Sequence, residues 1–178
     1  LPAERCSYVL GNPPFVGAKF MDDAQREDTR AVFDGIDNAG LLDFVAAWYV
    51  KAARYLHGTA ATPTRCAFVS TNSITQGEQV GALWGWLLAQ GLHIQFAHRT
   101  FSWSNEARGK AAVHCVIVGF GLQNLPGKVI YEYEDIKGEP LAVPAANINP
   151  YLVDAPDVVL PRRSQPICAV PEIGIGNK

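Results

Sequence analysis

The chain has 178 residues, of which 48% are hydrophobic and 18% are charged. This balance excludes an intrinsically disordered segment and predicts a folded unit of about one domain. The formal net charge of −2 excludes a globally basic nucleic-acid binder. Any contact with DNA therefore has to come from a local basic patch or from other parts of a larger protein.

The apolar patterning predicts, in chain order, a strand at residues 8–10, helices over 22–33 and 42–56, a strand at 65–70, a helix over 78–90, and strands at 92–97, 112–120 and 128–133. Residues 98–110 are expected to form a polar loop with two large aromatic side chains. The strand at 128–133 is expected at the edge of the sheet. Alternating strands and helices predict an α/β fold. From residue 138 onward the chain is rich in proline and lacks periodicity, which predicts an extended tail.

The four cysteines, Cys6, Cys66, Cys115 and Cys168, are far apart in the sequence and form no metal-ligand pair. They lie mostly in apolar runs, so we expect free thiols in a reducing cytoplasm and no bound metal. The sequence has neither a signal-peptide pattern nor an apolar run long enough to cross a membrane. A cytoplasmic location without a membrane partner is therefore expected.

The most informative stretch is Tyr8-Val9-Leu10-Gly11 followed by Asn12-Pro13-Pro14-Phe15. The apolar run predicts a buried strand that ends at Gly11, so that Asn12 projects from its carboxyl end. The two prolines remove two N–H donors and leave rigid carbonyl acceptors. An amide oxygen, a fixed carbonyl and a flat ring together suit a planar base that carries an exocyclic amine. A plain proline turn, with Phe15 in the core, is the alternative interpretation.

This Asn-Pro-Pro-Phe tetrad resembles motif IV of the amino-methyltransferases that use S-adenosylmethionine, chiefly those that modify adenine-N6 in DNA. With the tetrad, later features look like motifs IV to VIII of these enzymes, namely Asp43-Phe44, Phe68-Val69-Ser70, and the Phe101-x-Trp103 loop before Val113-x-Cys115-Val116-Ile117-Val118. Phe101 is the candidate for motif VIII. Residues 101–107, 147–152 and 162–166 are similar to the MmeI-like methyltransferases of type IIL restriction–modification proteins. Such proteins join a nuclease, a methyltransferase and a target-recognition domain in one chain.

The resemblance implies that a flipped adenine from double-stranded DNA is held at the tetrad. The side-chain oxygen of Asn12 and the carbonyl oxygen of Pro13 would accept the two amine hydrogens, with Pro14 keeping the backbone rigid. No strong general base is needed, because the amine sheds its proton only after it has become positively charged. Catalysis would rest on orientation and electrostatic stabilisation.

Phe15 would stack on one face of the flipped base, and Phe101 on the other, with Trp103 as the alternative to Phe101. Candidates for contact with DNA phosphates are the basic residues Arg99, Arg108, Lys110, Arg162 and Arg163. The family's cofactor-binding motif, a strand that ends in a Gly-x-Gly turn before a helix, should precede the tetrad and is absent here. S-adenosylmethionine is nevertheless the cofactor that the resemblance implies.

We therefore expect an excised piece of a longer protein, with the C-terminal half of a doubly wound Rossmann-like sheet and an antiparallel final strand. Residues 1–137 are expected to be part of the catalytic domain, and residues 138–178 a linker that leads into a target-recognition domain. The isolated piece should be inactive and bind S-adenosylmethionine weakly. RNA guanine-N2 and protein glutamine methyltransferases carry similar tetrads and stay alternatives, as does a non-catalytic assembly module.

Overall fold

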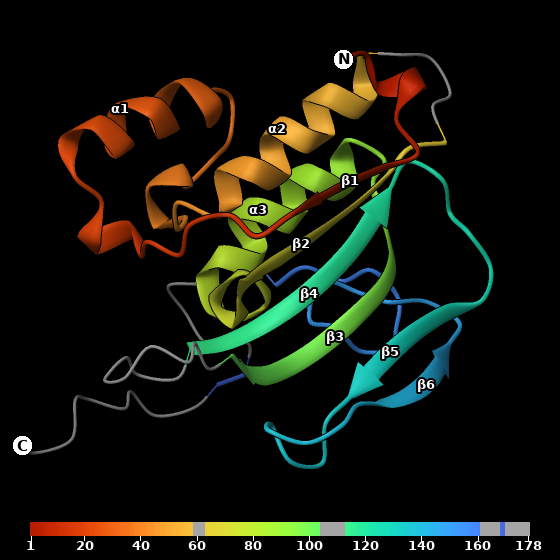
Figure 1. Ribbon diagram of the computed structural model, residues 1–178. Coiled ribbons are helices and arrows are strands. Elements are labelled where there is room, and N and C mark those ends of the chain that lie inside the picture. Colours follow the sequence, from red (N-terminus) through yellow and green to blue (C-terminus); the bar gives the residue numbers. More distant parts are fainter. Residues whose placement is uncertain (59–62, 104–112, 161–167, 170–178) are drawn as a thin grey trace, which may run out of the picture.

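The computed structural model describes residues 1–58, 63–103, 113–160 and 168–169. Within them the strands are β1 (Tyr8–Gly11), β2 (Arg65–Thr71), β3 (His93–Trp103), β4 (Val113–Gly121), β5 (Lys128–Glu132) and β6 (Leu141–Ala145). They form a six-stranded open sheet in the order β1-β2-β4-β3-β5-β6 (Figure 1). β1, β2, β3 and β5 run in one direction, and β4 and β6 run against them. The predicted α/β fold with an antiparallel strand is confirmed.

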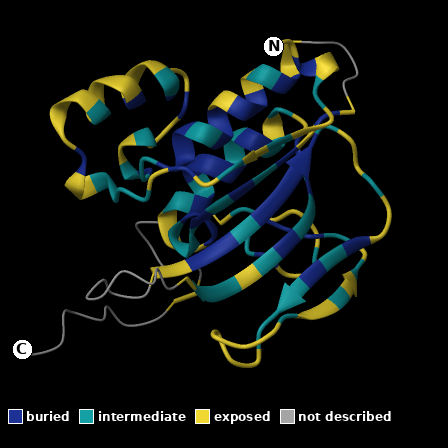
Figure 2. Ribbon diagram, viewed as in Figure 1, coloured by how far each residue is buried: buried dark blue, intermediate teal, exposed yellow. Residues whose placement is uncertain are grey.

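The main helices of the described residues are α1 (Asp23–Val32), α2 (Ala46–His57) and α3 (Gly77–Ala89), and they lie on one side of the sheet (Figure 1). The core lies between α2, α3 and the central strands. The buried ring of Tyr49 is 5.3 Å from the ring of Phe68 and 5.2 Å from that of Phe120. Its hydroxyl bonds to the hydroxyl of Ser70 at 2.8 Å, so no polar atom of this pair is left unpaired in the core. β4 is mostly buried, and β2 alternates between buried and partly buried residues (Figure 2). β1 at the edge of the sheet has no buried residue, so the predicted burial of this strand is wrong.

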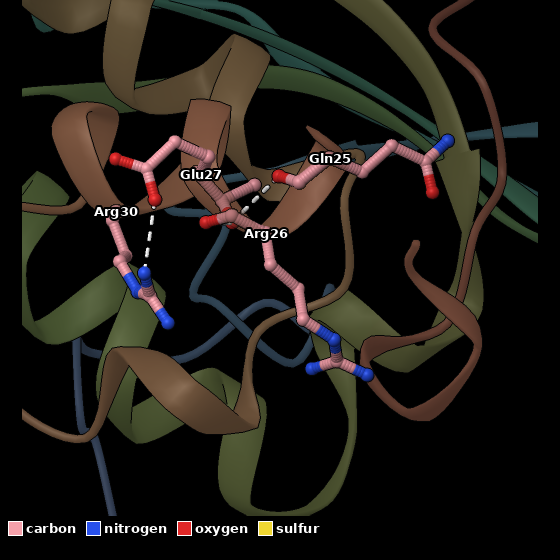
Figure 3. Close-up of polar contacts among 5 residues, drawn as sticks. Gln25, Arg26, Glu27 and Arg30 are labelled. Atoms are coloured by element: carbon pink, nitrogen blue, oxygen red, sulfur yellow. Dashed lines mark hydrogen bonds and ion pairs between the residues drawn. The ribbon is translucent and has the colours of Figure 1, made fainter. Parts of the chain in front are cut away.

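Helix α1 begins where the sequence predicts it. The Asp22 carboxylate accepts the N–H of Gln25 at 2.8 Å, and the Gln25 side chain accepts the N–H of Asp22 at 3.0 Å. This reciprocal pair satisfies two backbone donors at the helix start. Further along α1, Arg30 forms an ion pair with Glu27 at 2.9 Å (Figure 3). Both side chains are about three-quarters exposed, so solvent screening leaves the pair little stabilising effect.

The predicted loop over residues 98–110 is wrong for residues 98–103, which continue β3. They pair with β4 as far as Trp103 opposite Val113, with an irregular register between His98 and Phe101. Polar and aromatic residues mix here because this end of the strand is only partly buried, so neither side is uniformly apolar. Residues 104–112 lie outside the described part of the chain.

The predicted edge position of residues 128–133 is also wrong, because β6 pairs with β5 and takes the edge. Beyond β6, the side chains of Ile148 and Leu152 are buried in the same core as α2 and α3. The carboxylate of Asp154 accepts the N–H groups of Ala146 and Asn147 at 3.1 and 2.9 Å, which closes the turn between them. In the described residues, no helix is both long and apolar enough to span a membrane.

Candidate functional site

The tetrad lies in an irregular segment directly after β1, as the sequence predicts. Gly11 pairs with Phe68 of β2, and a β-carbon at Gly11 would come within 3.1 Å of the Phe68 ring. Glycine thus avoids a tight contact where β1 passes over this ring and enters the loop. The side chain of Asn12 is exposed, whereas the next residue, Pro13, is buried. The amide therefore projects from a loop that is held in place by a buried proline.

β1 and β2 are parallel, so Asn12 and the end of β2 lie on the same side of the sheet, at the carboxyl ends of these strands. Thr71, the last residue of β2, is level with Cys115 of β4, and Cys115 is level with Phe101 of β3. The carboxyl-end side of the sheet therefore carries both the tetrad and the predicted aromatic residues. Three strand spacings separate β1 from β3, roughly 14 Å.

The predicted stacking residues differ in their surroundings. Phe15 is partly buried and packs against the core. The ring of Phe101 is stacked on Tyr133 with 5.4 Å between centroids, and lies 6.2 Å from the ring of Trp103. Trp103 stands at the end of β3 and is 37% exposed. The stacking roles of these three residues stay predictions.

His98 and Tyr133 form the support beneath Phe101. The His98 ring stacks on Tyr131 at 4.2 Å, and its Nδ1 hydrogen-bonds to the Tyr133 hydroxyl at 2.8 Å. Desolvation by burial lowers the pKa of His98, which favours the neutral imidazole. Burial, with a smaller effect from the charge of Glu139, raises the pKa of Tyr133. The pair is thus a neutral, hydrogen-bonded aromatic unit that sequence reasoning missed.

Arg99 is the described member of the predicted phosphate-contact set. Its guanidinium donates to Glu132 at 3.0 Å, and both side chains are close to half exposed. Arg99 also lines a small recess with Thr75 and Leu152, where the edge of the sheet meets the segment after β6. Arg108, Lys110, Arg162 and Arg163 lie outside the described residues, so their contacts stay predictions.

Asp43, which the sequence singled out only as part of a motif, contacts three segments on this side of the sheet. Its Oδ1 accepts the N–H of Ala18 at 2.8 Å, and its Oδ2 accepts the hydroxyl of Ser73 at 2.6 Å. Its own N–H donates to the side-chain oxygen of Gln79 at 3.2 Å. No periodicity or spacing in the sequence indicates these contacts, because the partners lie 25 to 36 residues away.

A wide groove of about 1000 Å³ lies next to the tetrad, between the free edge of β1 and helices α1 and α2. Its walls include Gly11, Phe44, Trp48 and Phe68, and the rings of Phe44 and Trp48 meet edge to face at 5.0 Å. Glu27 and Asp28 of α1 add carboxylates to the rim. Lys51 lines the same groove and Glu27 is paired with Arg30, so the rim is mixed in charge. The aromatic walls of the groove can take a flat apolar group.

Among the described residues, no group of three His, Cys, Asp or Glu side chains lies close enough to hold a metal ion. The four cysteines are free thiols. Burial raises the pKa of the Cys66 thiol to about 12 and that of Cys115 to about 11, so both are protonated and unreactive at neutral pH.

Comparisons with known proteins agree with these observations. The profile of the "MmeI, DNA-methyltransferase domain" family matches residues 2–132. DNA methyltransferase A of Bacillus subtilis (strain 168) is 39% identical over 171 residues, which are 96% of this chain and 18% of that protein. The type IIL restriction–modification enzyme MmeI, solved in complex with DNA, is 58% identical with a TM-score of 0.91. The match covers 96% of this chain and 23% of the MmeI chain.

The chain thus spans about a fifth of the length of these two relatives. The family match includes the tetrad, the Asp43 contacts and the whole of β3 and β4. The predicted resemblance is confirmed: the chain belongs to the MmeI DNA-methyltransferase domain family.

Proposed function

We propose that this chain is the catalytic part of a DNA methyltransferase within a longer, cytoplasmic restriction–modification protein. It transfers a methyl group from S-adenosylmethionine to the exocyclic amine of an adenine that is flipped out of double-stranded DNA. One observation carries the proposal. The exposed amide of Asn12 stands on a proline-stiffened loop at the strand edge that also carries Phe101 and Trp103.

Asn12 and Pro13 orient the reacting amine. The side-chain oxygen of Asn12 accepts one amine hydrogen and the carbonyl oxygen of Pro13 accepts the other, which directs the nitrogen lone pair toward the methyl group. S-adenosylmethionine supplies an electrophilic methyl group when bound. The amine loses a proton to water after it has gained positive charge, so no dedicated base is required. The rate enhancement comes from orientation and from the fixed dipoles of the two oxygens.

The surroundings of the tetrad fit both partners of this reaction. The groove beside β1 offers aromatic walls for an adenosyl group, which suits it to form part of a donor site. The separation of roughly 14 Å between β1 and β3 leaves room for a base between the tetrad and Phe101 or Trp103. Each stacking contact is worth about 1–3 kcal/mol, which offsets much of the cost of unstacking the base.

The complete protein is the right material for the test, with nuclease and target-recognition domains expected in the same chain. Unmethylated plasmid DNA, RNA and protein fractions are incubated with radiolabelled S-adenosylmethionine, and mass spectrometry of the nucleosides identifies the methylated base. We expect N6-methyladenine in DNA. Label only in RNA or on glutamine would favour the alternative methyltransferases, and no label in any fraction would favour an assembly module.

Asn12→Ala is the variant that tests the proposed site. Loss of one orienting acceptor should lower kcat about 10²–10³-fold, by analogy with removal of an oxyanion-hole donor. DNA affinity should stay near the wild-type value, because phosphate contacts elsewhere supply most of it. Asn124→Ala, an exposed asparagine between β4 and β5 at the opposite edge of the sheet, is the matched control and should keep full activity. A wild-type kcat in Asn12→Ala would remove the tetrad from the mechanism.

A further inference from the structure

We propose that Asp43 is a positioning residue for the tetrad. Its carboxylate fastens the loop after Phe15 to the end of β2 and thereby sets the direction in which the Asn12 amide points. The role rests on the proposed function, because it serves the same reaction. Asp43 does not touch the base in this proposal; it acts through the backbone that carries Asn12.

The first contact is with the tetrad loop itself. Residues 12–17 have no regular secondary structure, so their conformation depends on a few specific contacts. The Ala18 N–H donates to Oδ1 of Asp43 at 2.8 Å, and the Phe44 N–H donates to the Val16 carbonyl oxygen at 2.9 Å. One bond runs in each direction between the loop and the segment that leads into α2. The loop is therefore held at two points two residues apart.

The second contact is with Ser73, in the short turn that directly follows β2. The Ser73 hydroxyl donates its one hydrogen to Oδ2 of Asp43 at 2.6 Å. The hydroxyls of Ser73 and Thr71 are 2.8 Å apart, so Thr71 must be the donor in that pair. Thr71 ends β2, the strand beside β1. A short chain of hydrogen bonds thus links the tetrad loop to the carboxyl end of the neighbouring strand.

The third contact keeps Asp43 in place. Its N–H donates to the side chain of Gln79 on α3 at 3.2 Å, and its carbonyl oxygen accepts the N–H of Ala46 at 3.0 Å, at the start of α2. Asp43 is thus held by two helices, while its carboxylate binds the tetrad loop and the turn after β2. A side chain that lacks two polar terminal atoms cannot bind both Ala18 and Ser73.

The test uses the complete protein with unmethylated plasmid DNA and S-adenosylmethionine. Asp43→Ala removes both carboxylate contacts and frees the loop. Because a displacement of 1 Å can lower a rate about 10²-fold, we expect kcat to fall by about that factor while DNA affinity stays unchanged. Asp43→Asn should restore most of the activity, since its amide oxygen can still accept from Ala18 and its NH₂ can donate to Ser73. Asp154→Ala is the matched control: like Asp43→Ala it removes a carboxylate that accepts two hydrogen bonds, here both from backbone N–H groups, in a segment away from the tetrad.

Hydrogen exchange gives a second readout that does not depend on activity. The Ala18 amide should exchange faster in Asp43→Ala than in the wild type, and its protection should return in Asp43→Asn. If the wild type methylates no DNA, the proposed function fails, while exchange at Ala18 still decides whether Asp43 holds the loop. Ser73→Ala replaces Asp43→Ala if the latter does not fold, and should show a smaller loss of kcat.

Two results would overturn the positioning role. One is wild-type kcat together with unchanged Ala18 protection in Asp43→Ala. The other is an equal loss of kcat in Asp43→Ala and Asp43→Asn with Ala18 still protected in Asp43→Asn, because this pattern would assign the effect to the negative charge of Asp43 and not to its hydrogen bonds.

Discussion

At the residue scale, Phe101 and Trp103 lie two positions apart on β3 and compete for the same predicted role. Phe101 is stacked on Tyr133, which is itself bonded to His98, so its ring is held in a defined orientation. Trp103 is more exposed and ends the strand. A preorganised ring loses less conformational entropy when a base stacks on it. Phe101 is therefore the better candidate.

We predict that Phe101→Ala lowers the population of flipped base in the complete protein by roughly 5- to 150-fold, the equivalent of about 1–3 kcal/mol of lost stacking. Fluorescence of 2-aminopurine at the target position reports this population directly. A target adenine that is already mispaired should restore part of the signal, because less unstacking is then required. If Trp103→Ala abolishes the signal and Phe101→Ala leaves it unchanged, Trp103 is the stacking residue instead.

The sequence predicts the tetrad's position well, because a short apolar run that ends in glycine has few alternatives to a strand and a loop. The contacts of Asp43 and the His98–Tyr133 hydrogen bond were not predictable in the same way. Each joins residues that are brought together only by the order of the strands, and neither leaves a local pattern. Long-range hydrogen bonds of this kind depend on how distant segments are arranged in the fold, which the local sequence pattern does not reveal.

At the scale of elements, the pairing of β3 with β4 contains a close approach that depends on glycine. Gly119 of β4 is opposite Phe96 of β3, and a β-carbon at position 119 would overlap the Phe96 ring. The ring covers the glycine and so buries the backbone that would otherwise face solvent. The sequence suggests no such role, since Gly119 lies inside an apolar run that a strand prediction simply spans.

We predict that Gly119→Ala lowers the free energy of unfolding by about 1–3 kcal/mol, because the Phe96 ring has to move out of its packed position. Urea denaturation measures the change. Gly40→Ala, where no atom lies within 4 Å of the added β-carbon, is the matched control and should be near neutral. Phe96→Ala combined with Gly119→Ala should cost less than the sum of the two single changes, since the clash is then absent. Equal stability of Gly119→Ala and Gly40→Ala would contradict the close approach.

Helices and strands of regular periodicity were predictable, but the order of the strands was not. β4 lies between β2 and β3, although it follows both in the chain. Strand order depends on pairing between distant segments, which a single sequence does not encode in its local pattern. For the same reason, β6 was missed: its residues Leu141–Ala145 include a proline and are mostly exposed, and only their pairing with β5 makes them a strand.

At the scale of the whole molecule, the question is whether the residues after 138 belong to the same folding unit as the sheet. Ile148 is 1% exposed and Leu152 is 2% exposed, and both belong to the core formed by α2, α3 and the central strands. Leu152 has a backbone φ of 56°, a left-handed conformation that is costly for leucine. A leucine persists in this conformation when burial of its side chain outweighs the backbone strain.

We predict that Leu152→Ala lowers the free energy of unfolding of the entire described sheet by about 2–5 kcal/mol, the usual cost of a cavity at a buried leucine. Hydrogen exchange of the β2 and β4 amides is the measurement, because these central strands open only when the whole unit unfolds. Val153→Ala is the control, since the neighbouring side chain is 36% exposed and should matter little. Faster exchange in β2 and β4 for Leu152→Ala alone would place residues 138–160 in the catalytic unit. Unchanged exchange there, with loss of protection confined to the segment after β6, would instead support the predicted boundary at residue 137, since the sheet would then be stable without that segment.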